Sequence, residues 1–133
     1  MTKRSSQRGA SSIEFGLLLP ILLVLTVAVL EMSWLFHHQL GATQAASDGA
    51  RLGTVTDQTT SFDATVRARV QRSLQGARID ASSAMIDITI QQDVEGHDEV
   101  LVEVDVAYTP LIGLIPTPNL VHGVAVAHLE DQY

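Results

Sequence analysis

Residues 8–36 read RGASSIEFGLLLPILLVLTVAVLEMSWLF, a predominantly apolar segment that begins at the end of a basic leader. Its part from 15 to 30 carries no charged side chain, and residues 31–36 extend the apolar segment to Phe36. An α-helix rises about 1.5 Å per residue, so a helix over residues 15–36 is long enough to cross a hydrocarbon core of about 30 Å. We therefore predict one membrane-spanning helix in this part of the chain.

The charges on the two sides of the apolar segment differ in sign. Lys3, Arg4 and Arg8 precede it, whereas residues 10–133 hold five arginines and fifteen acidic residues, a net charge of −10. The positive-inside rule then places the basic leader, residues 1–9, in the cytoplasm and the acidic body beyond the inner (cytoplasmic) membrane. An acidic surface repels phosphate, which argues against a nucleic-acid partner. The absence of cysteine excludes a disulfide framework.

Several residues inside the apolar segment affect how its helix sits. Pro20 lacks the amide that would bond to the Gly16 carbonyl, so we expect a bend there. Trp34 and Phe36 suit an aromatic belt at the far membrane interface, and Glu31 lies near enough to reach headgroups or water.

Two simpler interpretations of this segment stay open. A removable secretory signal has the same outline, but its apolar part is usually only about 7–15 residues long. Here the apolar part is longer, Glu14 lies at its start, and the small residues near Thr43 make a poor cleavage site. An ordinary uncleaved signal-anchor is the other alternative.

After the apolar segment the helix is predicted to continue to residue 56. Small residues recur every fourth position, at Gly41, Ala45, Gly49 and Gly53, and we call them the small-residue ladder. A face of this kind lets another helix approach closely. The ladder is thus either an assembly interface for a partner helix or the surface on which the chain's own sheet packs.

The rest of the chain changes from helical to strand periodicity. Phe62, Val66, Val70 and Leu74 form an apolar stripe that predicts an amphipathic helix ending at Gly76. Alternating patterns then predict three strands, around 86–91, 100–106 and 121–129, with a hairpin turn over 93–99. We expect an α+β fold, in which the second helix packs on a three-stranded antiparallel sheet. The predicted parts are the leader 1–9, the long helix 10–56 and a small domain 57–133.

The connection 108–119, the proline-rich segment, is unusually apolar. It combines three prolines with four large aliphatic residues. An exposed loop is rarely so apolar, so this segment must cover something. The bilayer surface, a neighbouring subunit and the open end of the domain's own core are the three candidates.

Residues typical of catalysis are few. His122 and His128 share a strand face and His97 lies beside Asp98 and Glu99, but no metal-binding spacing accompanies them. No glycine-rich phosphate loop and no Ser/His/Asp arrangement is suggested either. We therefore expect no enzyme activity, cofactor, metal site or small-molecule substrate.

The order of motifs along the chain resembles that of TadE-like proteins. Arg8-Gly9 precedes Ile13-Glu14-Phe15 and a Leu-Leu-Leu-Pro run, Gly49-Ala50-Arg51 follows the membrane helix, and the segment 102–108 leads into Pro110-Leu111. Family members are minor pilins or pseudopilins of the tight-adherence machinery, which builds Flp-type type IV pili. The family commonly has Arg-Glu ahead of Gly-Ala-Arg, where this chain has Ser47-Asp48.

The resemblance implies a processing site and a set of partners. Prepilin peptidase would cleave between Gly9 and Ala10, which makes Glu14 the fifth residue of the mature chain, followed by Phe15. The other implied partners are pilin-like subunits, the inner-membrane pilus assembly platform and membrane lipid. An uncleaved, membrane-tethered assembly factor is the alternative function, and a membrane protein unrelated to pili is a third. In a simpler view, Glu14 only reaches the cytoplasmic headgroups.

Overall fold

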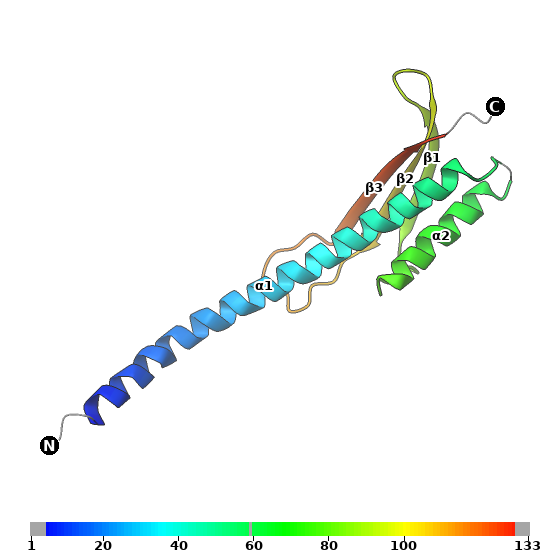
Figure 1. The fold of residues 1–133 in the computed structure, drawn as a ribbon. Coiled ribbons are helices and arrows are strands. Elements are labelled where there is room, and N and C mark those ends of the chain that lie inside the picture. Colours follow the sequence, from blue (N-terminus) through cyan, green and yellow to red (C-terminus); the bar gives the residue numbers. More distant parts are fainter. Residues whose placement is uncertain (1–4, 59, 130–133) are drawn as a thin grey trace.

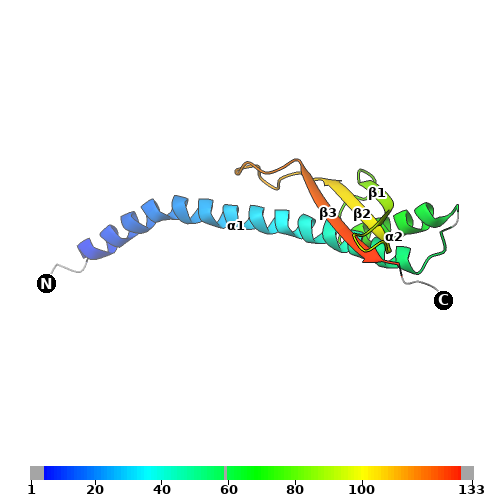
Figure 2. The ribbon, with the colours of Figure 1, turned by 90° about the horizontal axis from the view of Figure 1, so that it is seen from above.

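The computed structural model describes residues 5–58 and 60–129, so residues 1–4 of the predicted leader lie outside the described part. Its dominant element is a single helix, α1, which runs from Ser5 to Thr54 (Figure 1). The helix thus includes the end of the predicted leader and stops two residues before the predicted boundary at 56. Pro20 lies inside α1, and Figure 2 shows the helix bending within its blue N-terminal third.

The remaining elements form the α+β domain that the periodicities predicted. Helix α2 covers Phe62–Gly76, and the strands are β1, Met85–Gln92, β2, Asp98–Ala107, and β3, Leu120–His128. The strands form one antiparallel sheet in the order β1-β2-β3. Ile88 pairs with Val102, and Val102 pairs in turn with Ala125.

The core lies between the sheet and the two helices. The C-terminal half of α1 crosses one face of the sheet, and α2 lies beside it (Figure 1). Four valines of β2 are almost completely buried under these helices, at positions 100, 102, 104 and 106. The apolar stripe of α2 covers the same face, with Val66, Val70 and Leu74 fully buried.

Small residues allow α1 to lie close to the sheet. Ala42, Ala45, Ala46 and Ala50 are buried on the face of α1 that meets the domain. Opposite them in β3, a Cβ atom added at Gly123 would overlap the backbone of α1 at Ala42. Backbone therefore meets backbone at this crossing, which only a glycine permits.

The proline-rich segment leaves the sheet at the end of β2 and returns at the start of β3. The Tyr108 amide donates to the Asn119 carbonyl at 2.9 Å and closes its base. From there the segment extends past the sheet toward the N-terminal half of α1 and lies beside that helix (Figures 1 and 2). The turn between β1 and β2 lies at the opposite end of β2.

Candidate membrane and assembly surfaces

The N-terminal half of α1 is a bare apolar cylinder. From Ser12 to Leu30, every residue is exposed except Val27 and Ala28, which are half-buried. The helix over Ser12–Thr54 contains an 18-residue window with a mean hydropathy of 2.6, none of it buried. An exposed surface of this size and hydrophobicity needs an apolar environment. It is the one candidate membrane span among the described residues.

The predicted processing residues lie at the start of this bare half. Gly9 and Ala10 fall in the first turns of α1, and Glu14 and Phe15 are exposed on its surface further along. Because α1 is continuous here, Ala10 and Glu14 are one helical turn apart on the same face. This spacing would let the Glu14 carboxylate approach a charge at Ala10.

The small-residue ladder lies inside the domain. A Cβ added at Gly41 would overlap the Ile79 side chain, and one at Gly49 would come within 2.6 Å of Val70. At Gly53 it would come within 2.9 Å of Val100, and Ala45 is fully buried. The chain's own α2 and sheet therefore occupy this face of α1. The ladder packs inside the domain and does not form a free surface for a partner helix.

Glu31 is the most unusual residue of α1. Its side chain has no exposed surface, so the expectation that it reaches headgroups or water is wrong. Its carboxylate instead accepts hydrogen bonds from the amides of Leu111 and Ile112, each at 3.0 Å, and of Gly113 at 3.4 Å. The proline-rich segment thus places consecutive backbone donors around a charge that would otherwise be costly to bury.

A second group of contacts ties the base of the proline-rich segment to α1. The Trp34 indole Nε1 donates to the Thr109 carbonyl at 3.3 Å. The His38 ring lies edge-on to the Tyr108 ring, with 5.4 Å between their centroids. We call the contacts of Glu31, Trp34 and His38 with this segment the clasp. Together they hold the segment against about two turns of α1.

The Tyr108 ring contributes to the clasp, but its hydroxyl is unsatisfied within the described part of the chain. The hydroxyl is buried and has no hydrogen-bond partner among the described residues. Burial, and to a lesser degree the Glu31 carboxylate, raise the pKa of Tyr108 above its usual value. The tyrosine therefore stays neutral and contributes through its ring.

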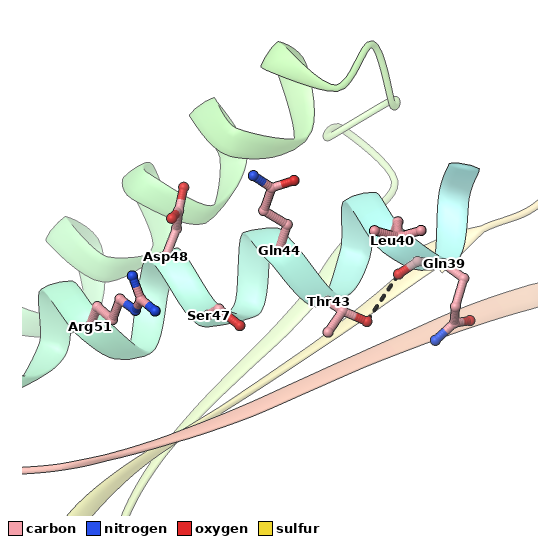
Figure 3. A pocket seen from close by; sticks show the side chains of 7 residues that line it. All are labelled: Gln39, Leu40, Thr43, Gln44, Ser47, Asp48 and Arg51. Carbon is pink, nitrogen blue, oxygen red and sulfur yellow. Dashed lines mark hydrogen bonds between the residues drawn. The ribbon is translucent and has the colours of Figure 1, made fainter. Parts of the chain in front are cut away.

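The outward face of α1 in the domain is polar and uncovered. Figure 3 shows seven residues that line a shallow groove there: Gln39, Leu40, Thr43, Gln44, Ser47, Asp48 and Arg51. Asp48 is tied to α2, because its carboxylate accepts from Arg69 at 3.3 Å and from Ser73 at 3.0 Å. Gln39 is tied to β3, because its side-chain amide donates to the His122 carbonyl at 2.7 Å.

The turn between β1 and β2 gathers acidic groups and a histidine. One ligand atom each from Asp93, Glu95 and His97 lie within 4.8 Å of one another, close enough to hold a metal ion. The Asp93 carboxylate, however, already accepts from the amides of Glu95 at 2.8 Å and His97 at 2.9 Å. The His97 amide is the main reason that the pKa of Asp93 is lowered. The hydrogen bonds of the turn therefore account for the position of the Asp93 carboxylate.

Sequence reasoning missed the clasp for a clear reason. Glu31 and its three donors are 80 or more positions apart, and the donors are backbone amides, which no side-chain motif marks. The only signals were a carboxylate inside an apolar helix and an apolar loop that had to cover something.

Comparison with known proteins supports the resemblance drawn from the motifs. The family model described as TadE-like protein matches residues 9–51. These residues contain the bare half of α1, Glu31 and most of the small-residue ladder, whereas the sheet and the proline-rich segment lie outside the match. The comparisons with curated proteins and with solved structures found no match. Over residues 9–51 the chain is therefore similar to TadE-like proteins, and this similarity suggests a protein associated with the Tad pilus.

Proposed function

We propose that this protein is a minor pilin or pseudopilin of a tight-adherence, Flp-type type IV pilus, which prepilin peptidase cleaves between Gly9 and Ala10. The main support for the proposal is that the two halves of α1 have different surroundings. One half is bare and apolar, and the other half is fixed in a small domain by the ladder and the buried alanines. Such a helix can stand in a bilayer before assembly and in the apolar core of a filament afterwards.

The chemistry at the start of α1 fits this role. Cleavage would create an ammonium group at Ala10, one turn from the Glu14 carboxylate. The carboxylate could neutralise that group, or the corresponding group of an adjacent subunit, which lowers the cost of placing either charge in an apolar setting. Loss of Lys3, Arg4 and Arg8 with the leader would remove three charges that oppose transfer from the membrane to a filament.

The surfaces that remain free suggest how partners would bind. The ladder is already covered by the chain's own domain. Contacts with pilin-like subunits and the assembly platform would therefore use the bare half of α1 and the polar groove on its domain half. The basic leader would stay in the cytoplasm and the domain would lie beyond the inner membrane. The proposal assigns the chain no catalytic role and no cofactor.

Two substitutions test the proposal in cells that make the pilus. Gly9→Leu should block processing, because a bulky side chain would stand at the scissile bond. Glu14→Ala should allow cleavage and reduce the yield of filaments sheared from the cells. Val94→Ala is the control, since Val94 is fully exposed in the turn between β1 and β2, away from the bare half of α1. The proposal fails if Gly9→Leu and Glu14→Ala both leave processing and piliation unchanged.

A further inference from the structure

We propose that the proline-rich segment is a second membrane contact, which inserts Leu111, Ile112 and Leu114 into the boundary between headgroups and acyl chains, with Glu31 as its buried anchor. This inference rests on the membrane-spanning role of α1 in the proposed function. It adds a second point at which the domain itself meets lipid and so fixes its height and tilt above the bilayer.

The surface of the segment is apolar and uncharged. Its residues 108–119 carry no charged side chain, in a body that is otherwise strongly acidic. Leu111, Ile112 and Leu114 are each 54–56% exposed, although they lie next to one another. A contiguous exposed group of large aliphatic residues marks a contact with something apolar.

The position of the segment selects lipid as its partner. Glu31 is seventeen residues after Glu14 on one continuous helix, which is about 26 Å along the axis at about 1.5 Å per residue. If Glu14 lies at the cytoplasmic edge of a core of about 30 Å, Glu31 lies just inside the opposite edge. The amides of Leu111 and Ile112 are bonded to Glu31, so these residues lie at the same depth.

Trp34 independently supports this depth of the segment in the membrane. Trp34 follows Glu31 by one turn on the side of the domain and bonds to Thr109 at the base of the segment. Tryptophan prefers the membrane interface, where its ring is apolar and its N–H finds a polar partner. The tip of the segment therefore lies on the lipid side of this belt, continuous with the exposed apolar surface of α1.

Four consecutive positions of the tip, Pro110 to Gly113, have no unpaired amide hydrogen. An irregular loop cannot enter lipid with unpaired amides, because each one would lose its hydrogen bond to water. Here Pro110 has no amide hydrogen, and the amides of Leu111, Ile112 and Gly113 donate to Glu31. The same bonds hide the Glu31 charge from lipid, so the clasp satisfies both groups at once.

Depth measurements on the full chain in phosphatidylcholine vesicles test the proposal. The chain has no cysteine, so single cysteines can carry an environment-sensitive fluorophore at chosen positions. The test position is Leu114→Cys. Val94→Cys, in the turn at the opposite end of the sheet, is the aqueous control, and Leu22→Cys, in the bare half of α1, is the membrane control.

We expect quenchers placed at the headgroup level of the lipid to act several-fold more strongly on Leu114→Cys than on Val94→Cys. Deep quenchers should act most strongly on Leu22→Cys. Aqueous iodide should reach Val94→Cys alone. Adding Glu31→Ala to the Leu114→Cys chain should move the label toward water.

Three results would overturn the inference. Iodide quenching of Leu114→Cys equal to that of Val94→Cys, with Leu22→Cys still deep, would refute lipid contact and leave the span intact. Shielding from both lipid and aqueous quenchers, with crosslinking between chains through Leu114→Cys, would assign the segment to a neighbouring subunit. An unchanged label depth after Glu31→Ala would refute the anchor. Iodide access to Leu22→Cys would instead refute the membrane span in the proposed function.

Discussion

Replacing Glu31 with alanine should release the tip of the proline-rich segment from α1. The substitution removes the acceptor of two hydrogen bonds of 3.0 Å, from Leu111 and Ile112, and of a longer one from Gly113. A hydrogen bond to a charged group contributes about 1.5–3 kcal/mol, so the two short bonds together stabilise the docked tip by at least about 3 kcal/mol. The longer bond adds little.

This loss is local, because the strands and α2 do not depend on the tip. A change of about 1.4 kcal/mol is tenfold in an equilibrium constant, so the three amides should exchange with deuterium roughly a hundredfold faster than in the original chain. The measurement is hydrogen–deuterium exchange of the full chain in detergent micelles, read on peptides that cover 109–115. Amides of β2 should be unaffected.

Two further variants sharpen the result. Glu31→Gln keeps one acceptor oxygen, so the increase should be intermediate. Glu14→Ala makes the same change of charge in the bare half of α1 and should leave the segment unchanged. If residues 111–113 of the Glu31→Ala chain exchange at the original rate, the bonds to Glu31 do not hold the tip against α1.

Three other substitutions test the rest of the structure, with unfolding in detergent followed by the fluorescence of the single tryptophan unless stated. Gly123→Ala should lower the free energy of unfolding by about 1–3 kcal/mol, because the new methyl group meets the backbone of α1 at Ala42, whereas Gly16→Ala should change it by less than about 0.5 kcal/mol. Equal values would refute the close crossing. Tyr108→Phe should leave the stability unchanged or raise it by about 1 kcal/mol, because it removes a buried hydroxyl without a partner among the described residues. A decrease of more than about 1 kcal/mol in the free energy of unfolding would show that the hydroxyl has a hydrogen-bond partner. Asp93→Ala should speed amide exchange in the turn between β1 and β2, since its carboxylate accepts two of the turn's amides. The pKa of Asp93 is lowered in the folded chain, so its stabilisation of the turn is present above the ordinary pKa of 3.8 and is lost as the pH falls through the lowered pKa. Amide protection of the turn that persists in strong acid would contradict this role.

Periodic features of the fold could be predicted from the sequence. The apolar stripe that includes Val66 and Val70 identified α2, and the alternation at 100–106 identified the most buried strand. These predictions succeed because a helix face or a strand face repeats at a fixed spacing wherever one side is buried. The bare half of α1 was equally clear from its composition.

Features that depend on distant parts of the chain could not be predicted. The small-residue ladder fits a partner helix and the chain's own sheet equally well, and only the three-dimensional structure shows Gly49 against Val70. Glu31 pointed to an interface, but the amides that bury it come from a segment without periodicity. Such pairings are set by where the proline-rich segment lies, which no local pattern encodes.

We propose that this chain is a processed, pilin-like membrane protein. Intact-mass and N-terminal analysis of the protein, purified from cells with and without prepilin peptidase, tests it most directly. We expect a chain that begins at Ala10 only when the peptidase is present. A chain that retains residues 1–9 in both cells would contradict it and would make the protein a permanent membrane anchor.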